Sequence, residues 1–413
     1  GGLRLGLLSA DFGDHPVGHA LLPWLRALRR ATGLTLLCFA SDSAEKRHAG
    51  TPLRRAIATA AHHFVDVTGL SDEAAARTIN DLRVHVLINL VGHTAGHRGV
   101  MLEHRPAPVQ AMHYGFPSTT ALPSMSYMLL DRVAAPPELH NDFTERMAYF
   151  PYSHFVAVHA ARYPHVPAAT RRAHPWAADR AVSALSDGTD ARRGDLGMPL
   201  SASMMEGVAL CNFNQLYKMD PSTVQAWAGA LRRLGPGASL WLSRVSVRRD
   251  SSKVAEVKLT REAAALGVGR RLMYAWKFPE EDYLSFRALA DVWVDNRMYN
   301  AHTTGADTLW AGLPAVVLQS RHLAGRAAAS FVSALGTASS VAAPGLRDYE
   351  NAIAEVGKRG PRLWKLRRRV LEAREASPFF DLDRLARAQE RLAHAMWRVH
   401  AAGYAPMHLV MAR

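Results

Sequence analysis

Two blocks of alternating short apolar runs and amphipathic stretches constrain the fold of this 413-residue chain most. In the first block, residues 1–170, runs typical of buried strands alternate with helical patterns. The alternation stops over residues 171–205, which are rich in Pro, Gly, Ser, Asp and Arg, and resumes over residues 206–346. Strands that alternate with helices predict a parallel sheet covered by helices on both faces. We therefore predict an α/β fold with two Rossmann-like, doubly wound domains joined by a linker, followed by C-terminal helices over residues 347–413.

The expected elements are placed by their apolar runs and helix-start signals. Strands are expected at residues 3–9, 34–39, 86–90, 109–112, 127–130, 207–211, 239–241, 271–274, 291–295 and 315–318. Helices are expected after Pro16, from Asp72, from Pro221, near residues 254–265, from Pro279, from Thr303 and from Ala324. From residue 348 the tail is expected to be helical throughout, ending in a helix over residues 382–400.

Composition argues against a membrane protein, a disulfide scaffold and a nucleic-acid binder. No apolar stretch reaches the roughly 18 to 20 residues that a membrane span needs, so we expect a soluble protein. Cys38 and Cys211 are the only cysteines, so neither a disulfide framework nor a cysteine zinc site is available, which suits a reducing compartment. The net charge of +14 would favour an anionic partner, but the arginines are dispersed without interleaved aromatics, so we expect no nucleic-acid partner. No Asp-x-Asp metal motif is evident, and we expect no metal.

Two polar segments each follow an expected strand of the second block. Residues 211–218, Cys-Asn-Phe-Asn-Gln-Leu-Tyr-Lys, end in Lys218 just before Asp220 and Pro221, which form a helix start with Asp as N-cap. Residues 302–305, His-Thr-Thr-Gly, open another expected helix, whose first N–H groups and positive dipole end attract anions. A lysine and a helix N-terminus, each at the carboxyl end of a strand, predict a diphosphate site.

These segments resemble signatures of the O-GlcNAc transferase family, family 41 of the glycosyltransferases. Further matches follow the family's order along nearly the whole chain: Asp-Phe-Gly-Asp-His-Pro-Val-Gly-His at 11–19, Arg-Pro-Ala-Pro-Val-Gln-Ala-Met at 105–112, Leu-Trp-Ala-Gly-Leu-Pro at 309–314 and Arg-Ala-Ala-Ala-Ser at 326–330. The resemblance implies the GT-B architecture, in which two Rossmann-like domains face a cleft. In this family an upstream array of tetratricopeptide repeats selects protein substrates, and no repeat of that period occurs here. Because residue 1 is Gly rather than Met, we expect the chain to begin inside a longer protein.

The resemblance implies an inverting, metal-independent enzyme that transfers N-acetylglucosamine from UDP-GlcNAc to Ser or Thr hydroxyls of proteins. It implies no cofactor besides the UDP-sugar donor, protein substrates as partners, and a location in the cytoplasm and nucleus. Two alternatives remain open: a protein O-fucosyltransferase that uses GDP-fucose on the same fold, and a catalytically weak or inactive binding protein. His302 argues against the first alternative, because the fucosyl-transferring branch has a small residue at this position.

The resemblance assigns the leaving-group cation to Lys218, since a fixed positive charge can neutralise a departing nucleoside diphosphate. Gln215 matches a nucleotide contact, whereas Asn212 and Asn214 would equally serve to hold the turn together.

The start of the second polar segment is expected to bind phosphate. His302, Thr303 and Thr304 offer N–H groups and hydroxyls to phosphate oxygens, although a plain N-cap role would also explain either threonine. Asp307, one turn into the helix, is expected to accept hydrogen bonds from ribose hydroxyls.

In the first block, His15 and Asp11 are the expected catalytic residues. His15 follows the first strand, and an imidazole near pH 7 can receive a proton or bond to a sugar or acceptor hydroxyl. Asp11 and ordered water are rival proton routes in the resembling family, and a helix-capping role would also explain His15.

One expected donor-binding loop departs from the family pattern. Gly115 and Pro117 match a loop that passes under the donor sugar, where the absence of a side chain permits close approach. The family has Gly at the positions of Ser118 and Ala121 and Asp at that of Ser126, so this loop differs in backbone freedom and charge.

A second departure concerns Glu280, which stands where a nucleotide-contacting lysine is common. A carboxylate near a diphosphate should weaken donor binding, unless Glu280 is a solvated residue in the first turn of the helix after Pro279. Tyr283 is still expected to stack on the base.

Overall fold

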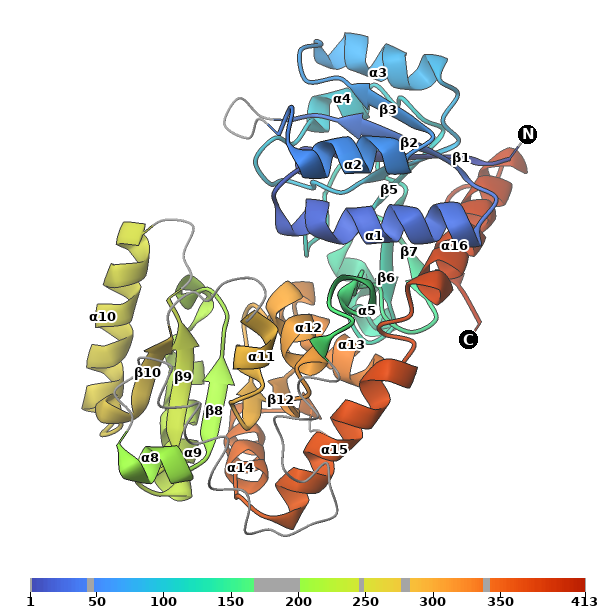
Figure 1. Cartoon of the computed structure of the whole chain (residues 1–413). Helices are drawn as coiled ribbons and strands as arrows, with labels where there is room; N and C mark the ends of the chain where they lie inside the picture. Colours follow the sequence, from blue (N-terminus) through green and yellow to red (C-terminus); the bar gives the residue numbers. More distant parts are fainter. Residues whose placement is uncertain are drawn as a thin grey trace. The chain divides into compact units, whose positions relative to one another are not determined.

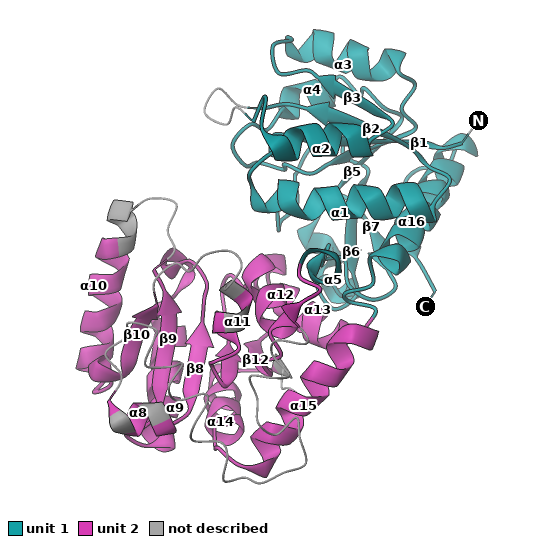
Figure 2. Cartoon of the chain, in the orientation of Figure 1, with its two compact units in different colours: residues 1–162, 378–413 teal, residues 163–377 magenta. Residues whose placement is uncertain are grey.

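The chain forms two compact units, each built on a parallel sheet. This computed structural model describes residues 2–42, 48–166, 201–244, 249–275, 283–336 and 342–412. Unit 1 comprises Gly1–Arg162 and Pro378–Arg413, and unit 2 comprises Tyr163–Ser377 (Figure 2). The predicted α/β architecture with two doubly wound domains is confirmed. Most of the predicted linker lies outside the described residues, and the predicted C-terminal region, 347–413, is divided between the two units.

Unit 1 contains an eight-stranded sheet in its described part. The strands are β1 (Arg4–Ser9), β2 (Thr35–Ala40), β3 (His63–Asp66), β4 (Val86–Asn89), β5 (Val109–Met112), β6 (Tyr127–Asp131), β7 (Arg146–Phe150) and β14 (Leu409–Val410). They run in the order β14-β7-β6-β5-β4-β1-β2-β3, and every pair is parallel. The helices are α1 (Pro16–Ala31), α2 (Pro52–Ala60), α3 (Asp72–Asp81), α4 (Gly99–Glu103), α5 (His159–Arg162) and α16 (Leu382–Ala401), with a 3₁₀ helix η1 (Pro137–Asp142). Helices α1 and α16 pack against each other, so the end of the chain completes the core of the first unit (Figure 1).

The described residues of unit 2 form a six-stranded parallel sheet. Its strands are β8 (Ala209–Asn212), β9 (Ser239–Ser243), β10 (Leu272–Ala275), β11 (Val292–Val294), β12 (Ala315–Leu318) and β13 (Ala342–Ala343), in the order β10-β9-β8-β11-β12-β13. Its described helices are α8 (Ala202–Glu206), α9 (Pro221–Leu234), α10 (Arg249–Ala265), α11 (Tyr283–Arg287), α12 (Thr303–Trp310), α13 (Ala327–Ala334), α14 (Leu346–Val356) and α15 (Pro361–Ala376), with 3₁₀ helices η4 (Leu216–Lys218), η5 (Gly269–Arg271) and η6 (Leu323–Gly325).

The C-terminal tail is not helical throughout, and this part of the prediction is wrong. After α16 the chain turns at Gly403 and adds β14 to the edge of the sheet, where Leu409 pairs with Ala148. The Nδ1 atom of His408 also accepts a hydrogen bond of 3.1 Å from the N–H of Met147. The edge of β7 thus supplies backbone groups that pair with the backbone and with the His408 side chain of the tail.

Parallel strand order brings the two polar segments of unit 2 together. Strand β11 pairs with β8, with Val292 opposite Leu210 and Trp293 opposite Cys211. Since the carboxyl ends of parallel strands meet at one edge of the sheet, the segments that follow β8 and β11 lie side by side.

No helix in the described ranges is long and apolar enough to cross a membrane.

Candidate active site

A network of amide side chains joins the two polar segments of unit 2. Asn212 donates from Nδ2 to the carbonyl of Val294 at 2.8 Å, and Asn214 donates from Nδ2 to Oδ1 of Asp295 at 3.3 Å. The hydroxyl of Thr304 donates to Oδ1 of Asn214 at 3.0 Å. The two asparagines therefore do hold the turn together, and they fix the start of α12 beside the end of β8.

Asp295 is a buried acidic residue of this network. Its side chain is inaccessible to solvent and accepts hydrogen bonds from the N–H of Ala301 at 3.0 and 3.2 Å. Burial raises the pKa of this carboxyl to about 7, although these hydrogen bonds and the charge of Lys218 favour ionisation. Asp295 is not among the site residues predicted from the sequence. The available signal was an acidic residue at the carboxyl end of a buried strand.

Lys218 lies partly buried at the end of η4, after β8. Its Nζ atom lies 3.7 Å from the centre of the Tyr299 ring, a cation–π contact. Burial lowers the pKa of Lys218 to about 8, and the nearby charge of Asp295 partly opposes this shift. The ammonium is therefore held in a partly dehydrated place, where it acts more strongly on a bound anion than it would in water.

The start of α12 offers backbone donors next to this ammonium. The helix begins at Thr303, with His302 as the N-cap, and the His302 ring lies 5.3 Å from the Tyr299 ring. The N–H of Gly305 donates to the carbonyl of His302 at 3.0 Å, whereas the N–H groups of Thr303 and Thr304, the first two residues of the helix, have no intrahelical acceptor and are suitable for an anion. Thr303 and Thr304 are partly exposed, in keeping with this role.

Asp307 has a close partner inside the protein. Its carboxylate lies 3.6 Å from Nη2 of Arg287, and both side chains are buried. Arg287 also donates from Nη1 to the carbonyl of Thr304 and to the hydroxyl of Thr308. This ion pair anchors α11 to α12 and by itself explains an aspartate at position 307. A contact of Asp307 with a ribose remains a prediction.

The other residues predicted to lie near the nucleotide are Gln215, Tyr283 and Glu280. Gln215 is partly buried directly before η4, and its carbonyl accepts from the N–H of Lys218 at 3.1 Å. Tyr283 is the first residue of α11, where the structure describes the backbone alone. Glu280 lies outside the described residues.

In unit 1, His15 caps α1 at the end of the loop that follows β1. Its Nδ1 atom accepts from the N–H of Val17 at 3.3 Å and lies 3.6 Å from Oδ2 of the buried Asp11. The neutral imidazole can cap the helix through Nδ1, whereas the protonated ring would instead face the Asp11 carboxylate with that atom. The helix-capping role of His15 is thus observed. The neutral ring has the N–H of Val17 as its partner, and the protonated ring has the carboxylate of Asp11.

Packing and hydrogen bonds within unit 1 determine the conformation of the loop after β5. A Cβ atom on Gly115 would lie 1.8 Å from the carbonyl oxygen of Leu90, so close approach of the chain after β4 already requires glycine. The buried carboxylate of Glu145 accepts from Thr119 and Thr120 and holds the following turn. Pro117 lies partly exposed in this loop. A contact of the loop with a donor sugar remains a prediction.

An Asp-x-Asp triplet does occur, at residues 381–383, so the expected absence of this motif is wrong. Asp381 caps α16 by accepting from the N–H of Arg384 at 2.9 Å, and Asp383 pairs with Arg30. Within the described ranges, no group of three or more His, Cys, Asp or Glu side chains is placed to hold a metal ion. Both aspartates therefore have structural partners.

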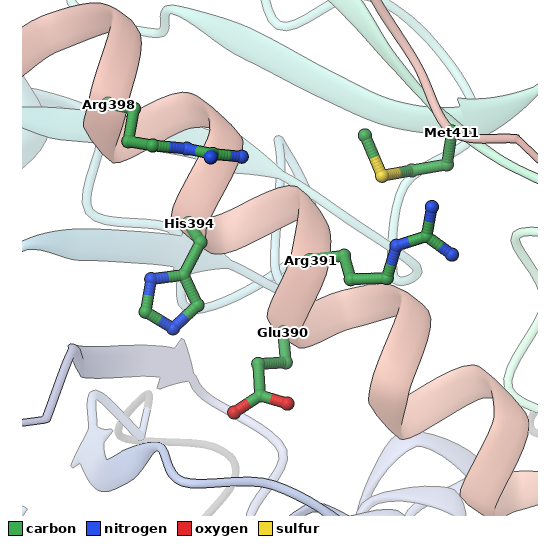
Figure 3. A pocket seen from close by; sticks show the side chains of 5 residues that line it. All are labelled: Glu390, Arg391, His394, Arg398 and Met411. Atoms are coloured by element: carbon green, nitrogen blue, oxygen red, sulfur yellow. The ribbon is translucent and has the colours of Figure 1, made fainter.

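Unit 1 has a surface hollow of about 350 Å³. The residues that line it are far along the sequence from the candidate site residues. Figure 3 shows its lining: four side chains of α16 and one from the tail, namely Glu390, Arg391, His394, Arg398 and Met411. None of them matches a predicted site residue, and Glu390 is already used to accept from the N–H of Gly33.

Comparison with known proteins decides the family. The model of glycosyl transferase family 41 matches residues 1–184 and 193–388. The chain belongs to this family. Over 407 residues it is 30% identical to a probable UDP-N-acetylglucosamine–peptide N-acetylglucosaminyltransferase SEC of Arabidopsis thaliana, covering 98% of this chain and 38% of that protein. It is 27% identical to the UDP-N-acetylglucosamine–peptide N-acetylglucosaminyltransferase of Caenorhabditis elegans, covering 98% of this chain and 42% of that protein. The family 41 chain thus spans about two fifths of the length of these relatives.

Solved structures support the GT-B fold. A mutant of the O-GlcNAc transferase from Thermobaculum terrenum superposes with a TM-score of 0.80 at 24% identity, covering 97% of this chain and 69% of that chain. At this identity the likeness establishes the fold, and the predicted GT-B class is confirmed.

Proposed function

We propose that this family 41 chain transfers N-acetylglucosamine from UDP-GlcNAc to Ser or Thr hydroxyls of proteins, with inversion and without a metal. The names of its relatives from Arabidopsis thaliana and Caenorhabditis elegans support the donor and the peptide acceptor. The observation that carries the proposal is the convergence of Lys218 and the start of α12 in unit 2, joined through Asn214 and Thr304.

In this proposal the reaction is one in-line displacement. The acceptor hydroxyl oxygen forms a bond to the anomeric carbon while the bond from that carbon to the diphosphate oxygen breaks. Lys218 and the first N–H groups of α12 stabilise the negative charge that grows on the departing UDP. The hydroxyl proton passes to His15, to Asp11 or to solvent. His15 is suited to this role because each of its protonation states has a partner in the structure.

The identity of the donor sugar is argued from His302. His302 favours UDP-GlcNAc over the GDP-fucose alternative on sequence grounds, and its ring lies against Tyr299, the residue that also contacts Lys218.

A transfer assay tests the proposal. The chain would be incubated with a pool of Ser- and Thr-containing peptides and with either tritiated UDP-GlcNAc or tritiated GDP-fucose, with the Lys218→Ala variant as matched control. We expect label in peptide with UDP-GlcNAc alone, and none with the variant. Label from GDP-fucose would establish the alternative donor. Nucleotide binding without transfer from either donor would favour the inactive binding protein.

A further inference from the structure

Tyr299 occupies an unusual place in the candidate site. It lies in the loop between β11 and α12, partly buried, with Nζ of Lys218 at 3.7 Å from the centre of its ring. The ring of His302 packs nearby at an interplanar angle of 60°. The aromatic ring is therefore held between the N-cap of α12 and the one cation that the proposed reaction needs.

The ring of Tyr299 is important for the ammonium of Lys218 because no acceptor group contacts this ammonium directly in the part of the chain that the structure describes. Its Nζ atom forms no hydrogen bond or ion pair with any other residue that the structure describes; the ring of Tyr299 is its recorded side-chain contact. Asp295 favours the protonated form of Lys218 through its charge, without a hydrogen bond or ion pair to Nζ. A partly buried ammonium without a direct acceptor tends to lose its proton, which would remove the charge needed at the diphosphate.

We propose that Tyr299 is a positioning residue for Lys218: its ring fixes the ammonium group and keeps it protonated. The ring covers one side of Nζ only, so the N–H donors that do not face the ring stay available to an anion. The benefit to sugar transfer rests on the proposed function, whereas the effect on Lys218 itself does not.

Other ionisable groups surround the pair and must be considered in any titration. They are Asp295 from the end of β11, His302 at the start of α12, Tyr217 beside Lys218, and Asp220 at the N-cap of α9, whose carboxylate accepts from Ser222 and Thr223. Burial raises the pKa of the Tyr299 phenol, and the neighbouring Tyr217 adds to this shift. Tyr299 therefore stays neutral over the range in which Lys218 titrates, and the ring rather than a phenolate provides the support.

A matched set of substitutions tests the proposal. Tyr299→Phe keeps the ring, Tyr299→Leu removes it, and replacement by phenylalanines of increasing fluorination weakens the ring's attraction for a cation at nearly constant size. The pKa of Lys218 would be measured by NMR on protein labelled with ¹³C-lysine, with Lys218→Met used to assign the resonance. Near-ultraviolet circular dichroism would establish that each variant is folded.

We expect Tyr299→Phe to leave the Lys218 pKa where it is, and Tyr299→Leu to lower it by about half to one unit, the range that a cation–π contact provides. Stepwise fluorination should lower it progressively, so the inference can be tested even if Tyr299→Leu does not fold. An unchanged Lys218 pKa in the leucine variant, or in the most fluorinated one, would overturn the inference.

A second readout separates this inference from the proposed function. The affinity for UDP would be measured by calorimetry from pH 7.5 to 9 for the parent, Tyr299→Phe and Tyr299→Leu. If Tyr299 positions Lys218, the alkaline loss of affinity should begin at lower pH in the leucine variant only. A chain that transfers no sugar but shows the shifted Lys218 titration would refute the proposed function and leave the inference standing. An active chain whose titration is unaffected by residue 299 would do the reverse.

Discussion

The hydroxyl of Thr304 donates a hydrogen bond of 3.0 Å to Oδ1 of Asn214. These residues are 90 positions apart and belong to the two segments that the sequence marks as an anion site. The bond links the segment after β8, which carries Lys218, to the first turn of α12. The cation and the helix N-terminus therefore belong to one site. It also engages the Thr304 hydroxyl as a donor, which leaves the backbone N–H as the more direct phosphate ligand at this residue.

Removal of the Lys218 cation should abolish turnover while the protein stays folded. Lys218→Ala takes away stabilisation that matters most as the diphosphate departs, on the order of 3 kcal/mol or more, or at least a hundredfold in kcat. Steady-state kinetics on a Ser-containing peptide would measure this, with circular dichroism and a thermal melt as the test of folding. A variant kcat within threefold of the parent would contradict the assignment.

The affinity for the nucleotide should fall as the pH rises above 8. The pKa of Lys218 is lowered to about 8 by burial, so the ammonium is present below this pH and lost above it. At pH 9, one unit above that pKa, only about a tenth of the lysine is protonated, and we expect UDP to bind about tenfold more weakly than at pH 7.5. Calorimetry at both pH values would check this, and Lys218→Ala should bind equally weakly at both. A parent affinity that does not change between them would mean that Lys218 does not contact the diphosphate.

The larger elements of the fold could be predicted because their signals are periodic and local. The strand expected at residues 315–318 is β12 itself, and helix α12 begins at Thr303 as expected. Strand β14 carried no such signal: it has two residues, both at least partly exposed, and it exists because the edge of β7 is available. Its pairing depends on a neighbour more than 250 positions away in the chain.

Within the site, the sequence indicated chemistry but not contacts. Lys218 and the start of α12 follow strands, and this placement was sufficient to bring them together. The cation–π contact with Tyr299 and the buried state of Asp295 depend on how side chains from two loops orient against each other, which local patterns do not specify. Asp307 shows the same limit, since its ion pair with Arg287 joins two helices.

Two substitutions of His15 should separate helix capping from catalysis. His15→Asn keeps a side-chain acceptor for the N–H of Val17 but lacks an imidazole, whereas His15→Ala lacks both. We expect the alanine variant to lose about 1 kcal/mol of stability and the asparagine variant to keep most of it. Both should lose at least tenfold in kcat if the ring moves a proton or binds the acceptor. Full activity in His15→Asn, measured by peptide transfer, would reduce His15 to a capping residue.

Chelation should leave the transfer rate unchanged. In the proposed reaction the charge on the diphosphate is met by Lys218 and the α12 N–H groups, and Asp381 and Asp383 of the one Asp-x-Asp triplet are engaged in a helix cap and an ion pair. Peptide transfer would be measured with EDTA, and again after adding an excess of manganese. A rate that falls with EDTA and recovers with manganese would show that a metal performs the leaving-group chemistry.

Ala121 should be replaceable by glycine with a gain in stability. It is exposed and adopts a φ of 52°, a left-handed conformation that an alanine adopts at a cost of about 1 to 2 kcal/mol. The resembling family has glycine at this position. Part of the relief is offset by the greater freedom of glycine in the unfolded chain, so we expect Ala121→Gly to stabilise unit 1 by about 0.5 to 1 kcal/mol. Ala402 is an exposed control with a φ of −81°, where glycine should give no gain. Urea unfolding followed by hydrogen exchange of peptides from unit 1 would measure both variants, and equal stabilities of Ala121→Gly and the parent would mean that the turn bears no strain.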